Sequence, residues 1–325
     1  MPDLHQALDE SLAFAAHYPV GGMQLSNHLP MVLTALWRLG APADALSATL
    51  ARMGPRLVPV AAGSAEARAA AGFADALHRD GLAPTLAVHL PGLLLAAETA
   101  AFHGLIRLAH ALDAQHPGEI ARALAAWQTS RLSLGPVLDA PLSNGQPSIA
   151  TAIDRLQGRA DLAFEPRQGT TITSDLQACV ALAGFEAASH GADAPSDQAL
   201  GIDPLAEASL AVYLASRDFT ALHLVTACHA WRQVEPLAGL GAAQARAARR
   251  GLWRAWLAAW LSIGRPAPDW AAVRQGSASE AAWQAALPQI ATSRDDHRIK
   301  LAWTALDEWW LRGWPGYARV VETRA

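Results

Sequence analysis

The sequence predicts an all-α protein, folded as a single irregular multi-helix domain over residues 1–325. Apolar residues recur at intervals of three and four along most of the chain, which is the period of an α-helix. Runs of β-branched residues typical of strands are almost missing. Hydrophobic residues make up 52% of the chain and charged residues 17%, against about 25% charged in ordinary domains. We therefore expect helices packed around an extensive core.

The first two helices are predicted from the spacing of their apolar residues. The first has an apolar face formed by Leu4, Leu8, Leu12 and Ala15. A glycine-rich turn at 19–22 is expected to end it. Ser26 or Asn27 is expected to cap the second helix, because short polar side chains accept hydrogen bonds from its first N–H groups. Its apolar face is formed by Met31, Ala35, Leu36 and Leu39. Gly40 and Pro42 follow it and are typical of a helix end.

Further helices are predicted wherever the same periodicity lies between prolines and glycines. Their ranges are 42–53, 64–79, 98–114, 118–131, 173–189, 204–217, 218–233, 240–263, 278–291 and 295–312. The segment 132–170 is the least regular, since it contains Pro136, Pro141, Asn144-Gly145 and Pro147. We expect this segment to be a lid or a partial boundary.

Charge and cysteine content exclude several classes of protein. The formal net charge is −4, and the longest arginine run is Arg249-Arg250, so the basic stripe needed to neutralise phosphates is missing. We expect no nucleic-acid partner. Cys179 and Cys228 are too few for a disulfide framework. They are interpreted as reduced core residues.

Neither targeting nor membrane insertion is predicted. The first ten residues are acidic where a secretory signal would be basic. The two charge-free stretches, 11–37 and 81–97, are interrupted by proline and glycine or are short, unlike a membrane span. We expect no membrane partner and a cytoplasmic location.

Common cofactor and hydrolase motifs are absent. Gly239-Leu-Gly241 follows a predicted helix and lacks the third glycine of a dinucleotide-binding turn. No P-loop, HExxH or GxSxG motif occurs. A Ser-x-x-Lys nucleophile also fails, because His297 precedes Lys300 at the serine position.

Several histidines lie in apolar helical surroundings, and they are His28, His89, His103, His110, His223 and His229. Any one of them alone is more often a hydrogen-bonded core residue, because a neutral imidazole needs only one donor and one acceptor. A group of buried imidazoles favours a shared explanation, and a metal ion supplies one.

Lysine usage gives an independent indication. Of 25 basic residues, 24 are arginine and only Lys300 is lysine. Chance retention in an arginine-biased sequence is one explanation. The functional alternative is that a desolvated lysine, unlike arginine, can lose its proton. A neutral amine can then add CO2 to form a carbamate, which is an anionic oxygen ligand for a metal.

Helical geometry relates these candidates. His297 and Lys300 are three residues apart and share a helix face. Asp295 and Asp296 precede them and are interpreted as mainly structural, at the N-cap and in the first turn. His223 and His229 are six apart, which separates them by about 120° around a helix. They are therefore not expected to be equivalent ligands.

These segments together resemble the questin oxidase-like family. The matching pieces are Asn27–Gly40, Ala101–Ala109, Leu222–Arg232 and Asp296–Leu301, in the family's order. The resemblance implies a non-haem iron centre of four histidines and a carboxylated lysine that uses O2 to open anthraquinone rings. The implied metal ligands are His28, His103, His223, His297 and carbamylated Lys300. The resemblance also suggests His229 as a proton shuttle or substrate-binding group and Thr226 as its polar neighbour.

The predicted function is thus a non-haem iron(II) oxygenase, mono- or dioxygenase, cleaving a carbon–carbon bond of an anthraquinone- or hydroquinone-type aromatic with O2. The expected partner is a small polyketide-like aromatic, and assembly into a homo-oligomer is allowed. One alternative is a Baeyer–Villiger monooxygenase using NADPH, which the missing dinucleotide motif disfavours. Another is a non-catalytic helical binding protein. A hydrolase with two metals bridged by the carbamate is disfavoured by the missing strands.

Tryptophans are concentrated near the C-terminus, at Trp303, Trp309, Trp310 and Trp314. Such residues most often pack in the core. Their flat rings would also suit a polycyclic substrate.

Overall fold

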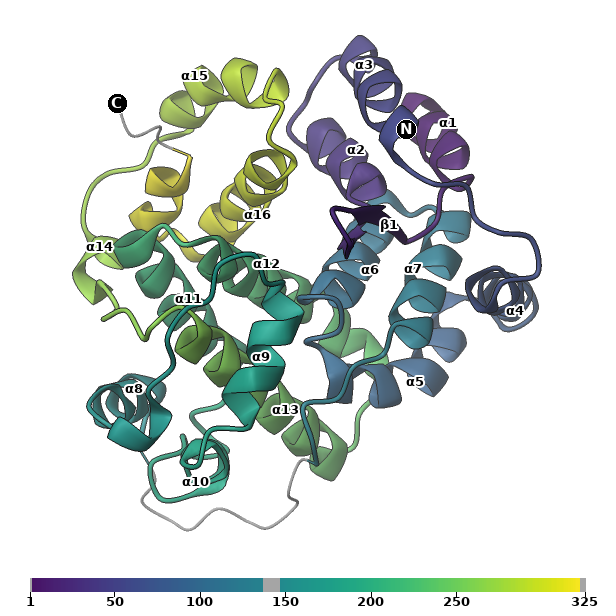
Figure 1. The fold of residues 1–325 in the computed structure, drawn as a ribbon. Coiled ribbons are helices and arrows are strands. Elements are labelled where there is room, and N and C mark those ends of the chain that lie inside the picture. Colours follow the sequence, from purple (N-terminus) through teal and green to yellow (C-terminus); the bar gives the residue numbers. More distant parts are fainter. Residues whose placement is uncertain (1, 137–146, 322–325) are drawn as a thin grey trace. The chain divides into compact units, whose positions relative to one another are not determined.

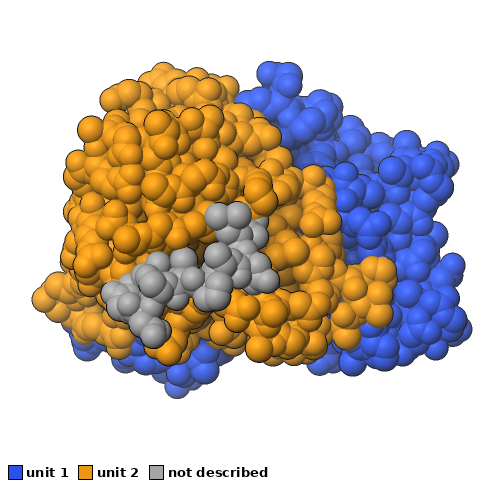
Figure 2. Space-filling view, turned by 90° about the horizontal axis from the view of Figure 1, so that it is seen from below, with its two compact units in different colours: residues 1–86, 103–130, 276–325 blue, residues 87–102, 131–275 orange. Residues whose placement is uncertain are grey.

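The computed structural model describes residues 2–136 and 147–321. The structure is 69% helical, and the described residues contain one small two-stranded sheet, which confirms the predicted all-α class (Figure 1). By contact density the chain divides into two compact units, coloured in Figure 2. Unit 1 comprises residues 1–86, 103–130 and 276–325, and unit 2 comprises residues 87–102 and 131–275. The expectation of one domain stays a prediction. None of the described helices is long and apolar enough to cross a membrane.

Unit 1 contains both ends of the chain and four of the five predicted metal ligands. Its α-helices are α1 (Pro2–Ser11), α2 (Leu29–Arg38), α3 (Ala43–Met53), α4 (Ala65–Asp80), α6 (His103–Ala114), α7 (Pro117–Thr129), α15 (Glu280–Ala291) and α16 (Asp296–Arg312). Two 3₁₀ helices, η1 (Gly54–Arg56) and η5 (Pro315–Val320), complete it. Helix α5 (Leu82–Leu93) runs from unit 1 into unit 2.

A two-stranded antiparallel hairpin replaces the simple turn expected after the first helix. Strand β1 (His17–Val20) pairs with β2 (Met23–Ser26), so that His17 lies opposite Ser26. Gly21 and Gly22 connect the strands with φ angles of 56° and 84°. Two consecutive positive φ angles are required by the tight turn whose twist matches a hairpin, and glycine adopts them without strain. The hairpin leads directly into α2.

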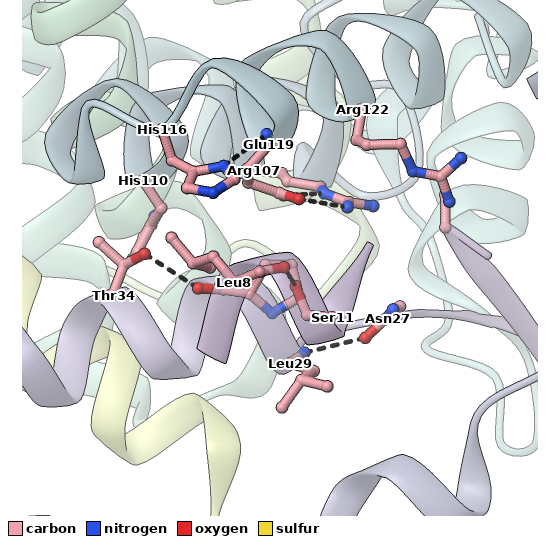
Figure 3. Close-up of polar contacts among 12 residues, drawn as sticks. Leu8, Ser11, Asn27, Leu29, Thr34, Arg107, His110, His116, Glu119 and Arg122 are labelled. Carbon is pink, nitrogen blue, oxygen red and sulfur yellow. Dashed lines mark hydrogen bonds and ion pairs between the residues drawn. The ribbon is translucent and has the colours of Figure 1, made fainter. Parts of the chain in front are cut away.

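Helices α2, α6 and α16 form the part of unit 1 that holds most of the candidate site. Helix α2 packs against α1, α3, α6 and α16, and α7 packs against α4 and α6. A buried ion pair joins α6 to α7, since Arg107 donates to both carboxylate oxygens of Glu119 at 2.6 and 3.0 Å (Figure 3). Gly104 lies directly against Trp127, where an added Cβ would come within 2.6 Å of the indole ring. Glycine therefore permits the close approach of α6 to α7.

Unit 2 is built around α12 and α13. Its α-helices are α8 (Ile149–Gln157), α9 (Ile172–Val180), α10 (Phe185–His190), α11 (Ile202–Ser216), α12 (Phe219–Val234), α13 (Ala242–Ser262) and α14 (Trp270–Arg274). Its 3₁₀ helices are η2 (Leu94–Ala96), η3 (Ala160–Leu162) and η4 (Glu235–Ala238). Helix α12 packs against α11 and α13, and α13 also packs against α9 and η2. Cys179 and Cys228 are both buried thiols that form no disulfide, as expected of core residues.

Several helix boundaries differ from the predictions. The helix predicted over 98–114 begins only at His103, and the one predicted over 173–189 is divided into α9 and α10. Helix α5 was not predicted, although its Pro84 lies in the first turn, where proline removes no helical hydrogen bond. The irregular segment 132–170 contains α8 and η3, while residues 137–146 lie outside the described residues. Its role as a lid stays a prediction.

Candidate metal centre

Four of the five predicted ligands lie in unit 1, at or near the starts of three helices. His28 is the N-cap residue of α2, and His103 is the first residue of α6. His297 and Lys300 lie in the first two turns of α16. Because side chains at helical positions three apart share a face, α16 presents His297 and Lys300 together, as their spacing predicted. The tertiary structure adds the two histidines from the other helices.

The three imidazoles converge on one point. The Nε2 atoms of His28 and His103 are 2.9 Å apart. One ring nitrogen from each of the three histidines lies within 4.8 Å of the others. The rings of His28 and His103 are nearly parallel, with centroids 4.7 Å apart, and the ring of His297 is perpendicular to His28 at 4.5 Å. The Nζ atom of Lys300 is 3.4 Å from Nε2 of His103.

This donor set fits a single metal ion. Metal–imidazole bonds of about 2.0–2.1 Å place two ligands at right angles roughly 3 Å apart, which matches the separation of the two Nε2 atoms of His28 and His103. A hydrogen bond between two neutral imidazoles has a similar length. A third imidazole and a buried amine at the same point favour the metal interpretation, because nitrogen donors gathered in this way suit transition metals. Metal binding itself stays a prediction.

Burial changes the chemistry of the lysine. Lys300 is 2% exposed, and desolvation lowers its pKa to about 7, against the opposing effect of the Asp296 and Asp295 carboxylates. Desolvation has this effect because a low-dielectric surrounding disfavours the charged ammonium. Near neutral pH a large fraction of the amine is therefore unprotonated, the form that can add CO2.

The two aspartates before His297 have different surroundings. Asp295 is the N-cap of α16, and its Oδ1 accepts hydrogen bonds from the backbone N–H groups of His297 and Arg298. This confirms the structural role expected of it. Asp296 lies beside the cluster, with Oδ2 3.9 Å from Nδ1 of His28 and Oδ1 3.5 Å from Nη1 of Arg52. Sequence reasoning assigned Asp296 a structural role only and did not predict these neighbours.

The backbone before His103 has an uncommon conformation. Ala100, Ala101 and Phe102 have φ angles of 52°, 57° and 68°, in the left-handed region that costs roughly 1–2 kcal/mol for each non-glycine residue. This run explains why α6 begins at His103 and not at residue 98. Phe102 is fully buried, so its packing helps to hold the turn. Strained backbone of this kind is concentrated at functional sites.

The other three predicted site residues lie in unit 2, on α12. All three are buried. Nδ1 of His223 donates to the carbonyl of Phe219 at 2.8 Å, which makes Nε2 the nitrogen with the lone pair that a metal would need. Thr226 donates to backbone carbonyls within α12, and Nε2 of His229 is 3.0 Å from the amide nitrogen of Gln233. Ligation by His223 and catalytic roles for Thr226 and His229 stay predictions.

Comparison with known proteins identifies the family of the chain. The model of the questin oxidase-like family matches residues 70–305, more than half of the chain. None of the curated protein sequences matches significantly. The matched range includes His103, His223, His297 and Lys300, whereas His28 precedes it. The place of His28 in the cluster therefore depends on the geometry and not on the match.

Proposed function

We propose that this chain, which belongs to the questin oxidase-like family and is thereby an oxygenase-type oxidoreductase, is a non-haem iron(II) enzyme. It would oxidise an aromatic substrate with O2. The proposed substrate is an electron-rich hydroquinone- or anthraquinone-type compound, and the proposed reaction is oxidative cleavage of a ring carbon–carbon bond. The residues proposed to hold iron are His28, His103, His297 and carbamylated Lys300.

One observation supports the proposal most strongly, namely the convergence of His28, His103 and His297 with buried Lys300. His28 and His103 are 75 residues apart in the chain, and His103 and Lys300 are 197 residues apart. Helical periodicity therefore does not account for their proximity. Three imidazoles and a buried amine gathered at one point form a set of nitrogen donors that suits a transition metal.

The lysine balances the charge of the proposed centre. Neutral Lys300 attacks CO2 through Nζ, so that an N–C bond forms, a proton is released to solvent and a carbamate anion results. The dipoles of α2, α6 and α16 favour this anion, since each helix begins within one residue of a cluster histidine and helix N-termini attract negative charge. The neutral imidazoles supply the remaining donors.

Iron(II) held by these residues would supply the electrons that activate O2, which protein side chains do not provide. The residues themselves position the ion and limit access of water, because His103 and Lys300 are buried while His28 and His297 are only partly exposed.

The first experiment measures iron by elemental analysis in anaerobically purified full-length protein. We expect about one iron per chain in the wild type, and little in His103→Ala and Lys300→Met. The methionine retains the packing volume of the lysine but has no amine. His110→Asn is the matched control, because His110 is a buried histidine on the same helix whose Nδ1 bonds the carbonyl of Ile106, a contact that asparagine can reproduce.

Two further measurements test the chemistry. Protein incubated with ¹³C-labelled bicarbonate should show a carbamate carbon resonance that is missing from Lys300→Met. Oxygen consumption should depend on iron and on an added hydroquinone. Wild-type protein without iron after reconstitution, or full iron content in Lys300→Met, would overturn the proposed centre and favour a helical binding protein.

A further inference from the structure

The two ring nitrogens of His28 face different partners. Nε2 points to the cluster, since it lies 2.9 Å from Nε2 of His103. Nδ1, on the other side of the ring, lies 3.9 Å from Oδ2 of Asp296. A carboxylate near Nδ1 stabilises the neutral tautomer that carries its proton on Nδ1. In that tautomer the lone pair is on Nε2.

Asp296 is itself held in place. Its second oxygen, Oδ1, lies 3.5 Å from Nη1 of Arg52, and the same guanidinium nitrogen lies 3.5 Å from the backbone carbonyl of Arg294. Asp296 is also fixed through the backbone as the first residue of α16, the helix that supplies His297 and Lys300. The carboxylate is thus directed at His28 by a side chain of α3 and by the start of α16.

From this arrangement we infer that Asp296 is a positioning residue for His28. The carboxylate selects the tautomer of His28 protonated at Nδ1, orients the ring and makes Nε2 a stronger donor. At 3.9 Å it acts by electrostatic attraction or through one bridging water molecule. Carboxylates commonly assist metal-binding histidines in this way, and their loss typically weakens metal affinity about 10- to 100-fold.

The inference rests on the proposed metal centre but is separate from the reaction catalysed. Asp295 caps α16 through backbone N–H groups, and its Oδ1 also lies 3.8 Å from Nδ1 of His297, whereas Asp296 faces His28. Asp295 is therefore not a neutral comparison for Asp296. Asp44, an exposed carboxylate in the first turn of α3 and more than two helical turns before Arg52, is the matched control.

The test is a cobalt(II) titration of the metal-free, full-length protein, with cobalt as the spectroscopic probe. We expect Asp296→Asn to bind cobalt about 10- to 100-fold more weakly than the wild type. Asp44→Asn removes the same charge from an exposed position on α3, the helix that supplies Arg52. The Kd of this control for cobalt should stay within about threefold of the wild-type value. A tenfold change in Kd would correspond to about 1.4 kcal/mol, so the expected change in binding free energy is small.

A second readout follows the ring itself. In the cobalt protein, the N–H protons of bound imidazoles give strongly shifted, exchangeable proton NMR signals. The signal missing from His28→Gln identifies the Nδ1–H of His28. It should exchange with solvent much faster in Asp296→Asn than in Asp44→Asn. If Asp296→Asn does not fold, the wild type still decides the question, since a His28 signal that exchanges too fast to observe would contradict the inference.

The outcomes separate the two proposals. A wild type that binds no cobalt and no iron would overturn the metal centre. A wild type that binds metal, with equal affinity in both asparagine variants and unchanged exchange of the His28 proton, would leave the centre intact and overturn the role of Asp296.

Discussion

Replacing Glu98 with glutamine should make the protein more stable at alkaline pH. Glu98 is 3% exposed, and its Oε1 accepts a hydrogen bond from the backbone N–H of Leu134 at 3.0 Å. Burial raises the pKa of its carboxyl group from 4.5 to about 7, against the opposing effects of backbone hydrogen bonds and of Arg254 and Arg131. Glutamine retains an acceptor for Leu134 but has no charge to desolvate.

The sign and size of the effect follow from proton linkage. Because the folded-state pKa is raised, the folded protein keeps a proton that the unfolded chain loses, so stability is complete below pH 4.5 and decreases as pH rises through 7. With these two values, ionisation of Glu98 costs about 1 kcal/mol at pH 5 and about 3 kcal/mol at pH 8. The advantage of Glu98→Gln should therefore grow by about 2 kcal/mol between these pH values.

The assay is urea unfolding of wild type and variant at both pH values, with the difference in unfolding free energy as the result. Glu165→Gln is the control, because Glu165 is exposed and its carboxylate stays in water in both states. An advantage for Glu98→Gln that is equal at pH 5 and pH 8 would refute the assignment of a buried, protonated carboxyl group.

Three other substitutions test the packing that positions His103. Gly104→Ala places a methyl group 2.6 Å from the buried ring of Trp127 and should lower the free energy of unfolding by about 1–3 kcal/mol. The control Gly72→Ala, with open space around it, should raise the free energy of unfolding by about 0.5–1 kcal/mol. Equal unfolding midpoints for the two variants would contradict this. Ala100→Gly should stabilise by about 0.5–1 kcal/mol, because glycine tolerates a φ of 52°, and a lower midpoint would disprove strain there. Glu119→Gln leaves a buried guanidinium without its countercharge and should cost about 3–5 kcal/mol in chemical denaturation, so a loss below about 1 kcal/mol would show that the pair is dispensable.

Local sequence patterns determined most of the helices. Helix α16 illustrates this, since its predicted range of 295–312 agrees with the observed Asp296–Arg312 and its N-cap is Asp295. Helical hydrogen bonds join residues four apart, so periodicity and capping residues are sufficient evidence. The same local geometry placed His297 and Lys300 on one face. Resemblance to a family, and not periodicity, selected His28 and His103 among the other histidines.

Local patterns failed where distant residues determine the backbone. The left-handed run Ala100–Phe102 contains no glycine, so nothing in its composition predicted that the helix would begin at His103. The burial of Phe102 and the hydrogen bond from Leu132 to Thr99 hold this turn. Such contacts override intrinsic propensity because tertiary packing exceeds the small differences in propensity between residues.

The sequence by itself determined that the chain is helical, that it has one lysine, and that this lysine shares a helix face with a histidine. Only the tertiary structure brought His28 and His103, 75 residues apart, to within 2.9 Å of each other, and directed Asp296 toward the far side of the His28 ring. Local spacing cannot predict these contacts, because they depend on how α2, α6 and α16 pack. The desolvation that lowers the pKa of Lys300 has the same origin, since burial is a property of the folded chain.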